Sequence, residues 1–212
     1  SLDSEGNPSR LEATSGQQER HVKGGRTEPP RSILLSTLGT SWAVVAEAYG
    51  FLAPGVVDLY RHHSAAGRLS EVRSRHDLAP PDEIWIVTTE SADTKGPLGQ
   101  LAEWWDGLCP GSRPGLRIWQ VESLATTDEQ EECARMREAI FRVCLRASEE
   151  ASGRLTLCLA GGRKTMSADV QSAGSFFGAT TLLHIVAPTP LPEHLRVLQP
   201  KDLLDPLPAD VV

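Results

Sequence analysis

Five short apolar segments alternate with segments of helical pattern along this chain. The apolar runs cover residues 33–38, 83–88, 116–121, 155–160 and 180–186, and the helical patterns lie at 41–52, 98–108, 128–152 and 166–177. Alternation of this kind predicts parallel strands joined by helical crossovers, and uninterrupted apolar strands indicate burial on both faces of a sheet. We therefore predict an α/β fold, a Rossmann-like parallel sheet of five or six strands with helices on both faces.

The flanking segments differ from this alternating region in composition. Residues 1–32 are rich in Ser, Gly, Glu, Arg and Pro and show no apolar period, which predicts a disordered head or linker. Residues 33–186 hold all the alternating segments and are expected to form one domain. Residues 187–212 contain six prolines and are predicted to be a Pro-rich C-terminal tail. The role of residues 53–82 stays open, with a lid over the site, a dimer contact and no role in the site as alternatives.

Charge and composition exclude several classes of protein. The net charge of −7 and the pI near 5.4 provide no general basic surface, so DNA is not expected as a partner. Apolar runs are too short to span a bilayer and the first residues are polar, so we expect a cytoplasmic protein without membrane contact. The cysteines lack the paired spacing of a metal motif, so we expect reduced thiols, no metal and no cofactor; they are Cys109, Cys133, Cys144 and Cys158.

The segment after the fourth apolar run has the chemistry of an anion site. Gly161 and Gly162 allow the backbone to approach a ligand closely, and the helix that follows offers free N–H groups at its positive end. Two cations, Arg163 and Lys164, and two hydroxyls stand beside it. The spacing matches neither the Walker phosphate loop nor the dinucleotide-binding fingerprint. The alternative is a tight strand-to-helix turn with solvated cations.

Two further strand ends carry unusual residues. Gly39-Thr40-Ser41-Trp42 follows the first apolar run and Thr88-Thr89 ends the second. Ligands of parallel sheets bind at the carboxyl ends of the strands, near a topological switch point, so these loops converge with the double-glycine loop if the first and fourth strands are neighbours. Ser41 is a candidate helix N-cap that can also bind phosphate. Trp42 is either a core or dimer contact or a platform for a base.

Together these three motifs resemble the CARF domain, the CRISPR-associated Rossmann fold. The string from Gly161 to Ser167, Gly-Gly-Arg-Lys-Thr-Met-Ser, is similar to that of one CARF subfamily. The resemblance covers residues 33–186. It implies a homodimeric sensor that binds cyclic oligoadenylate across its two-fold axis in type III CRISPR antiviral signalling. The ligand-binding residues it implies are Gly39, Thr40, Ser41, Trp42, Thr88, Thr89, Gly161, Gly162, Arg163, Lys164, Thr165, Met166 and Ser167.

Three functions remain open at this stage. The first is a sensor, as a stand-alone protein or as part of an effector. The second is a ring nuclease, which would cleave the ligand without a metal by attack of a ribose 2′-hydroxyl, with Lys164 and Ser41 as the candidate catalytic residues. The third is a nucleotide-binding α/β domain with another ligand. The sequence leaves open the ring size, with cyclic tetra-adenylate favoured, and any effector domain before residue 1 or after residue 212.

Overall fold

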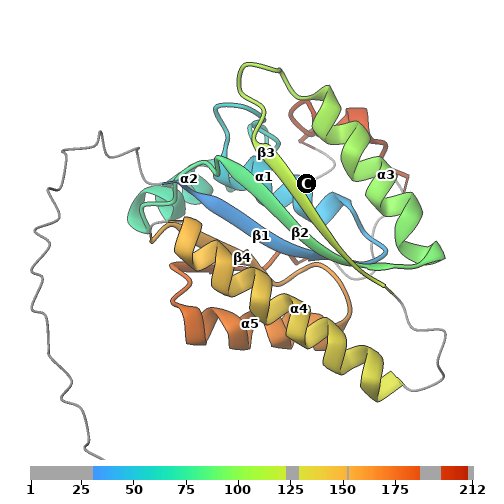
Figure 1. The fold of residues 1–212 in the computed structure, drawn as a ribbon. Helices are drawn as coiled ribbons and strands as arrows, with labels where there is room; N and C mark the ends of the chain where they lie inside the picture. The colour runs from blue at the N-terminus through green and yellow to red at the C-terminus, as the bar shows by residue number, and fades with distance from the viewer. Residues whose placement is uncertain (1–30, 123–128, 152, 187–196, 210–212) are drawn as a thin grey trace, which may run out of the picture.

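The computed structural model describes residues 31–122, 129–151, 153–186 and 197–209. Five parallel strands form one sheet in the order β3-β2-β1-β4-β5 (Figure 1). This confirms the predicted α/β class and the parallel sheet. The elements are β1 (Ile33–Leu38), α1 (Ala43–Leu52), α2 (Ala66–Arg75), β2 (Glu83–Glu90), α3 (Ala92–Gly107), β3 (Gly115–Glu122), α4 (Glu129–Glu150), β4 (Leu155–Cys158), α5 (Lys164–Phe177), β5 (Thr181–Leu183) and the 3-10 helix η1 (Pro200–Leu203).

Helices cover both faces of the sheet, as the apolar strands predicted. Helices α1 and α3 and the short η1 lie on one face, and α4 and α5 lie next to each other on the opposite face (Figure 1). Alternate residues of the central strand β1 pack in two hydrophobic cores, one on each face of the sheet. Leu34 and Leu38 of β1 contact the α1 side, whereas Ile33 and Leu35 contact the α4 side, and all four are fully buried. No described helix is both long and apolar enough to cross a membrane.

Several element boundaries differ from the sequence prediction. Helix α3 begins at Ala92, six residues earlier than predicted, and contains Pro97 in its second turn. The Ser91 N–H donates to the Thr94 hydroxyl at 3.3 Å, which fixes this early start. Strand β5 is shorter than predicted because it ends at Leu183. His184, which the sequence placed inside the strand, lies beyond it and is exposed.

Residues 197–209 pack against the domain, although the sequence assigned them to a tail. Leu203 of η1 is fully buried, and its carbonyl accepts a hydrogen bond of 2.9 Å from the Trp104 indole of α3. The Leu207 N–H donates to the Leu59 carbonyl at 3.0 Å. The domain boundary predicted at residue 186 is therefore too early. Leu59 also gives segment 53–82 a packing role, since it is fully buried in the α1-side core.

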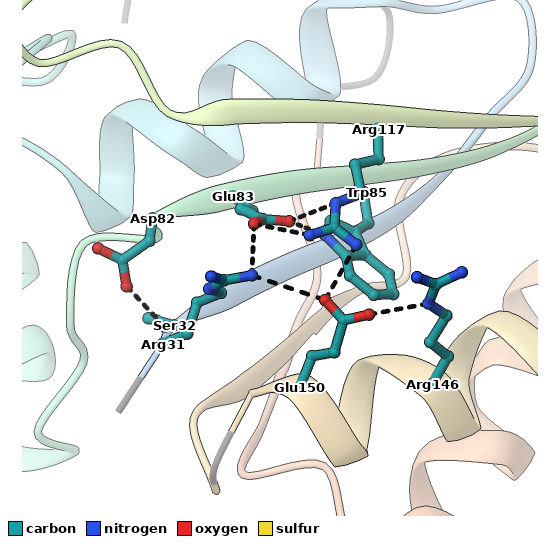
Figure 2. A network of polar contacts seen from close by, with 8 residues as sticks. All are labelled: Arg31, Ser32, Asp82, Glu83, Trp85, Arg117, Arg146 and Glu150. Atoms are coloured by element: carbon teal, nitrogen blue, oxygen red, sulfur yellow. Dashed lines mark hydrogen bonds and ion pairs between the residues drawn. The ribbon is translucent and has the colours of Figure 1, made fainter. Parts of the chain in front are cut away.

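An ionic network joins four parts of the chain at the amino-terminal edge of the sheet (Figure 2). Glu83 begins β2, and its side chain is only 13% exposed. It accepts hydrogen bonds from Arg31 at 2.9 Å and from the Trp85 indole at 2.6 Å. Arg117 of β3 binds both of its oxygens, at 2.8 and 2.9 Å, in a bidentate pair. Arg31 belongs to segment 1–32, which the sequence predicted to be a disordered head or linker. Residues 1–30 of that segment lie outside the described residues.

The same network reaches the last turn of α4. Glu150 accepts from Arg117 at 2.9 Å and from Arg146 at 2.8 Å. The hydrogen bond from Arg146, with the charge of Arg117, holds the pKa of Glu150 below its ordinary value. Arg117 also stacks 4.8 Å above the Trp85 ring. The carboxyl end of α4 is therefore fixed to the two strands β2 and β3.

We predict that Glu83→Gln lowers the free energy of unfolding by about 1–3 kcal/mol, because two guanidinium groups lose their shared, partly buried carboxylate. Urea denaturation followed by circular dichroism measures this change. The control is Glu138→Gln, which breaks an exposed i,i+4 pair with Arg142 on α4 and should change stability by about 0.5 kcal/mol or less. Equal effects of the two substitutions would contradict the prediction.

Candidate functional site

The turns after β1 and β4 touch each other through their backbones. The two strands are hydrogen-bonded neighbours, and their order changes direction at this point of the sheet. A Cβ atom added at Gly39 would lie 3.0 Å from the Cα atom of Gly162. The structure thus brings together the two loops that the sequence expected to meet at the switch point.

Neither glycine of the β4 turn has room for a side chain. A Cβ atom at Gly161 would lie 1.7 Å from the carbonyl oxygen of Thr37, and Gly162 adopts a φ of +76°. The Thr37 hydroxyl donates a hydrogen bond of 2.6 Å to the Gly161 carbonyl. Thr37 is fully buried in β1 and therefore fixes the position of the turn. The sequence analysis missed it, since a threonine inside an apolar strand gives no signal of its own.

Three of the predicted ligand hydroxyls are engaged within the protein or withdrawn from solvent. The buried Thr88 hydroxyl donates to the Leu38 carbonyl at 2.8 Å. The Ser167 hydroxyl donates to the Leu159 carbonyl at 2.8 Å. Thr89 is 8% exposed, and its hydroxyl lies 3.4 Å from that of Ser91. Thr88 and Ser167 thus hold the loops in place.

Trp42 and Met166 are packing residues in this structure. Trp42 is 5% exposed in the α1-side core, which favours the core alternative over a platform for a base. It is also the N-cap of α1, so the prediction that Ser41 caps this helix is wrong. Met166 is 4% exposed, and its sulfur accepts a hydrogen bond of 3.4 Å from the Arg163 N–H.

The remaining predicted residues form an exposed rim around the contact between the turns. Thr40 and Ser41 are exposed on one turn, and Arg163, Lys164 and Thr165 are exposed on the other. Helix α5 begins at Lys164, and the side chain of its N-cap, Arg163, makes no capping hydrogen bond. The N–H groups of the first turn, the helix dipole and two cations are therefore combined in one place, which suits an anion.

A narrow cleft between α4 and α5 borders this rim. Its volume is about 10 Å³, enough for about one water molecule. Glu132 of α4 lies 3.5 Å from the guanidinium of Arg163, and Arg137 of α4 lies 3.6 Å from Asp169 of α5. Burial raises the pKa of Asp169, against the opposing charge of Arg137. The sequence analysis did not single out Glu132 as a site residue, because the packing of α4 on α5 is not visible in the pattern of either helix.

A family model for the CRISPR-associated protein NE0113 matches residues 76–203, more than half of the chain. This chain belongs to the NE0113 family of CRISPR-associated proteins. No curated protein matches it. The matched range extends through η1, in agreement with the packing of that helix on the NE0113-family domain.

Two solved structures have a similar arrangement of elements. One is Can2 from Sulfobacillus thermosulfidooxidans in complex with cyclic tetra-adenylate, with 10% identity, a TM-score of 0.43, and coverage of 74% of this chain and 33% of Can2. The other is Csm6 from Enterococcus italicus bound to cyclic hexa-2′-fluoro-hexa-dAMP, with 10% identity, a TM-score of 0.47, and coverage of 82% and 37%. This NE0113-family chain spans about a third of each. At these identities and scores the likeness assigns neither a ligand nor an activity.

The NE0113-family chain also carries, on α1, a carboxyl group whose pKa departs from its ordinary value. Glu47 lies on α1, one turn beyond Ala43, and burial raises its pKa to about 7. Its charge in turn raises the pKa values of Tyr60 and Cys158, for both of which burial is the larger cause. Tyr60 and Cys158 both pack in the α1-side core, and the sequence analysis singled out neither Glu47 nor Tyr60.

We predict that Gly161→Ala destabilises the protein by about 3 kcal/mol or more, because the new methyl group overlaps the Thr37 carbonyl and the whole turn must shift. Thermal unfolding measures the effect. Gly111→Ala is the control, since a Cβ atom there meets nothing within 4 Å. A Gly161→Ala variant as stable as this control would show that the contact between the turns is dispensable.

We also predict a pH-dependent effect of Glu47→Gln. Because the pKa of Glu47 is raised by folding, this residue costs stability as the pH rises from its ordinary value of 4.5 to about 7. The variant should therefore exceed the wild type in unfolding free energy by about 1–3 kcal/mol near pH 8, with a smaller gap near pH 5. Urea denaturation across this range tests it, and a gap that stays constant with pH would contradict the assignment.

Proposed function

We propose that this chain binds a cyclic oligoadenylate across a homodimer in type III CRISPR antiviral signalling. The observation that supports this best is the backbone contact between the turns at Gly39 and Gly162. That contact places hydroxyls, cations and the start of α5 on one rim. Membership in a CRISPR-associated family and the sequence resemblance to CARF domains favour cyclic oligoadenylate over other anionic ligands of this site.

The chemistry of the rim suits a phosphodiester. Each phosphate carries one negative charge and accepts hydrogen bonds from N–H groups, hydroxyls and guanidinium groups. The chain is acidic overall, with a net charge of −7, so Arg163 and Lys164 must supply the attraction locally. A ring of identical nucleotides has symmetry, and a two-fold dimer would present the same rim twice to it.

Ring cleavage is the second candidate function. The 2′-oxygen of one ribose would attack the adjacent phosphorus, and the bond from phosphorus to the 5′-oxygen would break. The products are a 2′,3′-cyclic phosphate and a 5′-hydroxyl, and the proton of the 2′-hydroxyl balances the one gained by the leaving oxygen. The exposed Lys164 would stabilise the additional charge on the phosphoryl group, and Ser41 would orient the phosphate. A hydrogen-bond donor in such a role lowers the activation free energy by about 2.7–4 kcal/mol.

We predict that Lys164→Ala lowers the affinity for cyclic tetra-adenylate by about tenfold or more, since a charge-assisted hydrogen bond contributes about 1.5–3 kcal/mol. Isothermal titration calorimetry measures the affinity. Lys201→Ala is the control, because Lys201 is exposed on η1, which packs on α3, and this substitution should leave binding unchanged. Unaltered affinity in Lys164→Ala, with the fold intact, would contradict the site.

One incubation separates the candidate functions. Labelled cyclic tetra-adenylate or cyclic hexa-adenylate is mixed with the purified protein in the presence of a metal chelator. An intact ring in complex with a dimer, observed by sedimentation, supports the sensor. Linear products with a 2′,3′-cyclic phosphate end support the ring nuclease. If neither ring binds, the remaining candidate is an α/β domain for another nucleotide.

A further inference from the structure

We propose that the Arg163–Glu132 ion pair couples ligand binding to the position of α4. This inference rests on the proposed function, because it takes Arg163 to be a phosphate ligand. Without an anion, Arg163 bridges the start of α5 to the first turns of α4. A bound phosphate takes Arg163 away from Glu132 and so removes that bridge. Glu132 therefore both weakens the apparent affinity of the site and transmits its occupancy.

The geometry of the pair fits an exchangeable contact. The guanidinium of Arg163 and the carboxylate of Glu132 are 3.5 Å apart, which is longer than the 2.7–2.9 Å of a strong charge-assisted hydrogen bond. The Arg163 side chain is 63% exposed and that of Glu132 is 25% exposed. Partly exposed ion pairs of this kind contribute little to stability. A phosphate held also by the start of α5 and by Lys164 can therefore displace the carboxylate.

A second ion pair limits what α4 can do when the first one breaks. Arg137 and Asp169 join the same two helices 3.6 Å apart, about one and a half turns further along α4. The Asp169 side chain is 20% exposed and that of Arg137 is 63% exposed. This pair still connects the helices after Arg163 has left, so the first turns of α4 respond before the rest of the helix.

Labelling of the Cys133 thiol can measure whether the contact between Arg163 and Glu132 is formed. It follows Glu132 directly, is partly exposed and lines the cleft of about 10 Å³ beside Arg163. Separation of the helix starts would expose its thiol. Of the other cysteines, Cys144 and Cys158 are buried and Cys109 is exposed. A Cys109→Ser background therefore makes thiol labelling selective for Cys133.

The experiment compares Glu132→Gln with Glu138→Gln in the Cys109→Ser background. We expect Glu132→Gln to label Cys133 several times faster than the background protein without any ligand, and Glu138→Gln to label at the background rate. Saturating cyclic tetra-adenylate should accelerate labelling of the background protein and have little further effect on Glu132→Gln. Glu132→Gln should also bind the ring about two- to fivefold more tightly. Background labelling rates in Glu132→Gln, or weaker binding by it, would overturn the proposal.

Tripolyphosphate is the probe that separates this inference from the proposed function. It carries the phosphate charge of the ring without the adenines. If neither ring binds but tripolyphosphate binds Glu132→Gln more tightly than the background protein, and Arg163→Ala abolishes this gain, the coupling stands and the ring proposal falls. If the rings bind but Glu132→Gln changes neither the labelling rate of Cys133 nor the affinity for the ring, only the coupling proposal is wrong. Circular dichroism melting confirms that each variant is folded.

Discussion

The candidate site depends on the contact between the β1 and β4 turns. A fully buried hydroxyl on β1, that of Thr37, holds the carbonyl of Gly161, and the absence of side chains at Gly39 and Gly162 lets the two backbones touch. Everything proposed for the rim follows from this contact. If the turns were a few ångströms apart, the hydroxyls of one and the cations of the other could not reach a single phosphate.

The fold could be predicted from the sequence because several independent patterns indicate the same arrangement of strands and helices. The apolar strand at 33–38 is too uniform to have a solvent-exposed face, and the alternation with helices leaves a parallel sheet as the consistent solution. The end of the domain could not be predicted. The prolines around η1 resemble those of a tail, and only the fitting of Leu203 beneath Trp104 shows that this segment completes the core.

The meeting of the β1 and β4 turns was predicted from the sequence, but the internal contacts of their residues were not. Hydroxyl and glycine residues at strand ends indicated two loops that the structure brings into contact. Whether a hydroxyl faces a ligand or a carbonyl is decided by tertiary contacts, and Ser167 and Thr88 face carbonyls. Glu132 could not be found, because its meeting with Arg163 depends on how two helices distant in sequence lie against each other.

The two ends of α4 are held very differently. At its carboxyl end, Glu150 is joined to Arg117 and Arg146 within the network of Figure 2, whereas in its first turn Glu132 meets the rim through a long, partly exposed ion pair. A helix of 22 residues is about 33 Å long. Because the Arg137–Asp169 pair and the buried Met136 hold the helix beyond its first turn, a change at the rim would displace the first turn of α4 most, and a neighbouring molecule at that place would sense it.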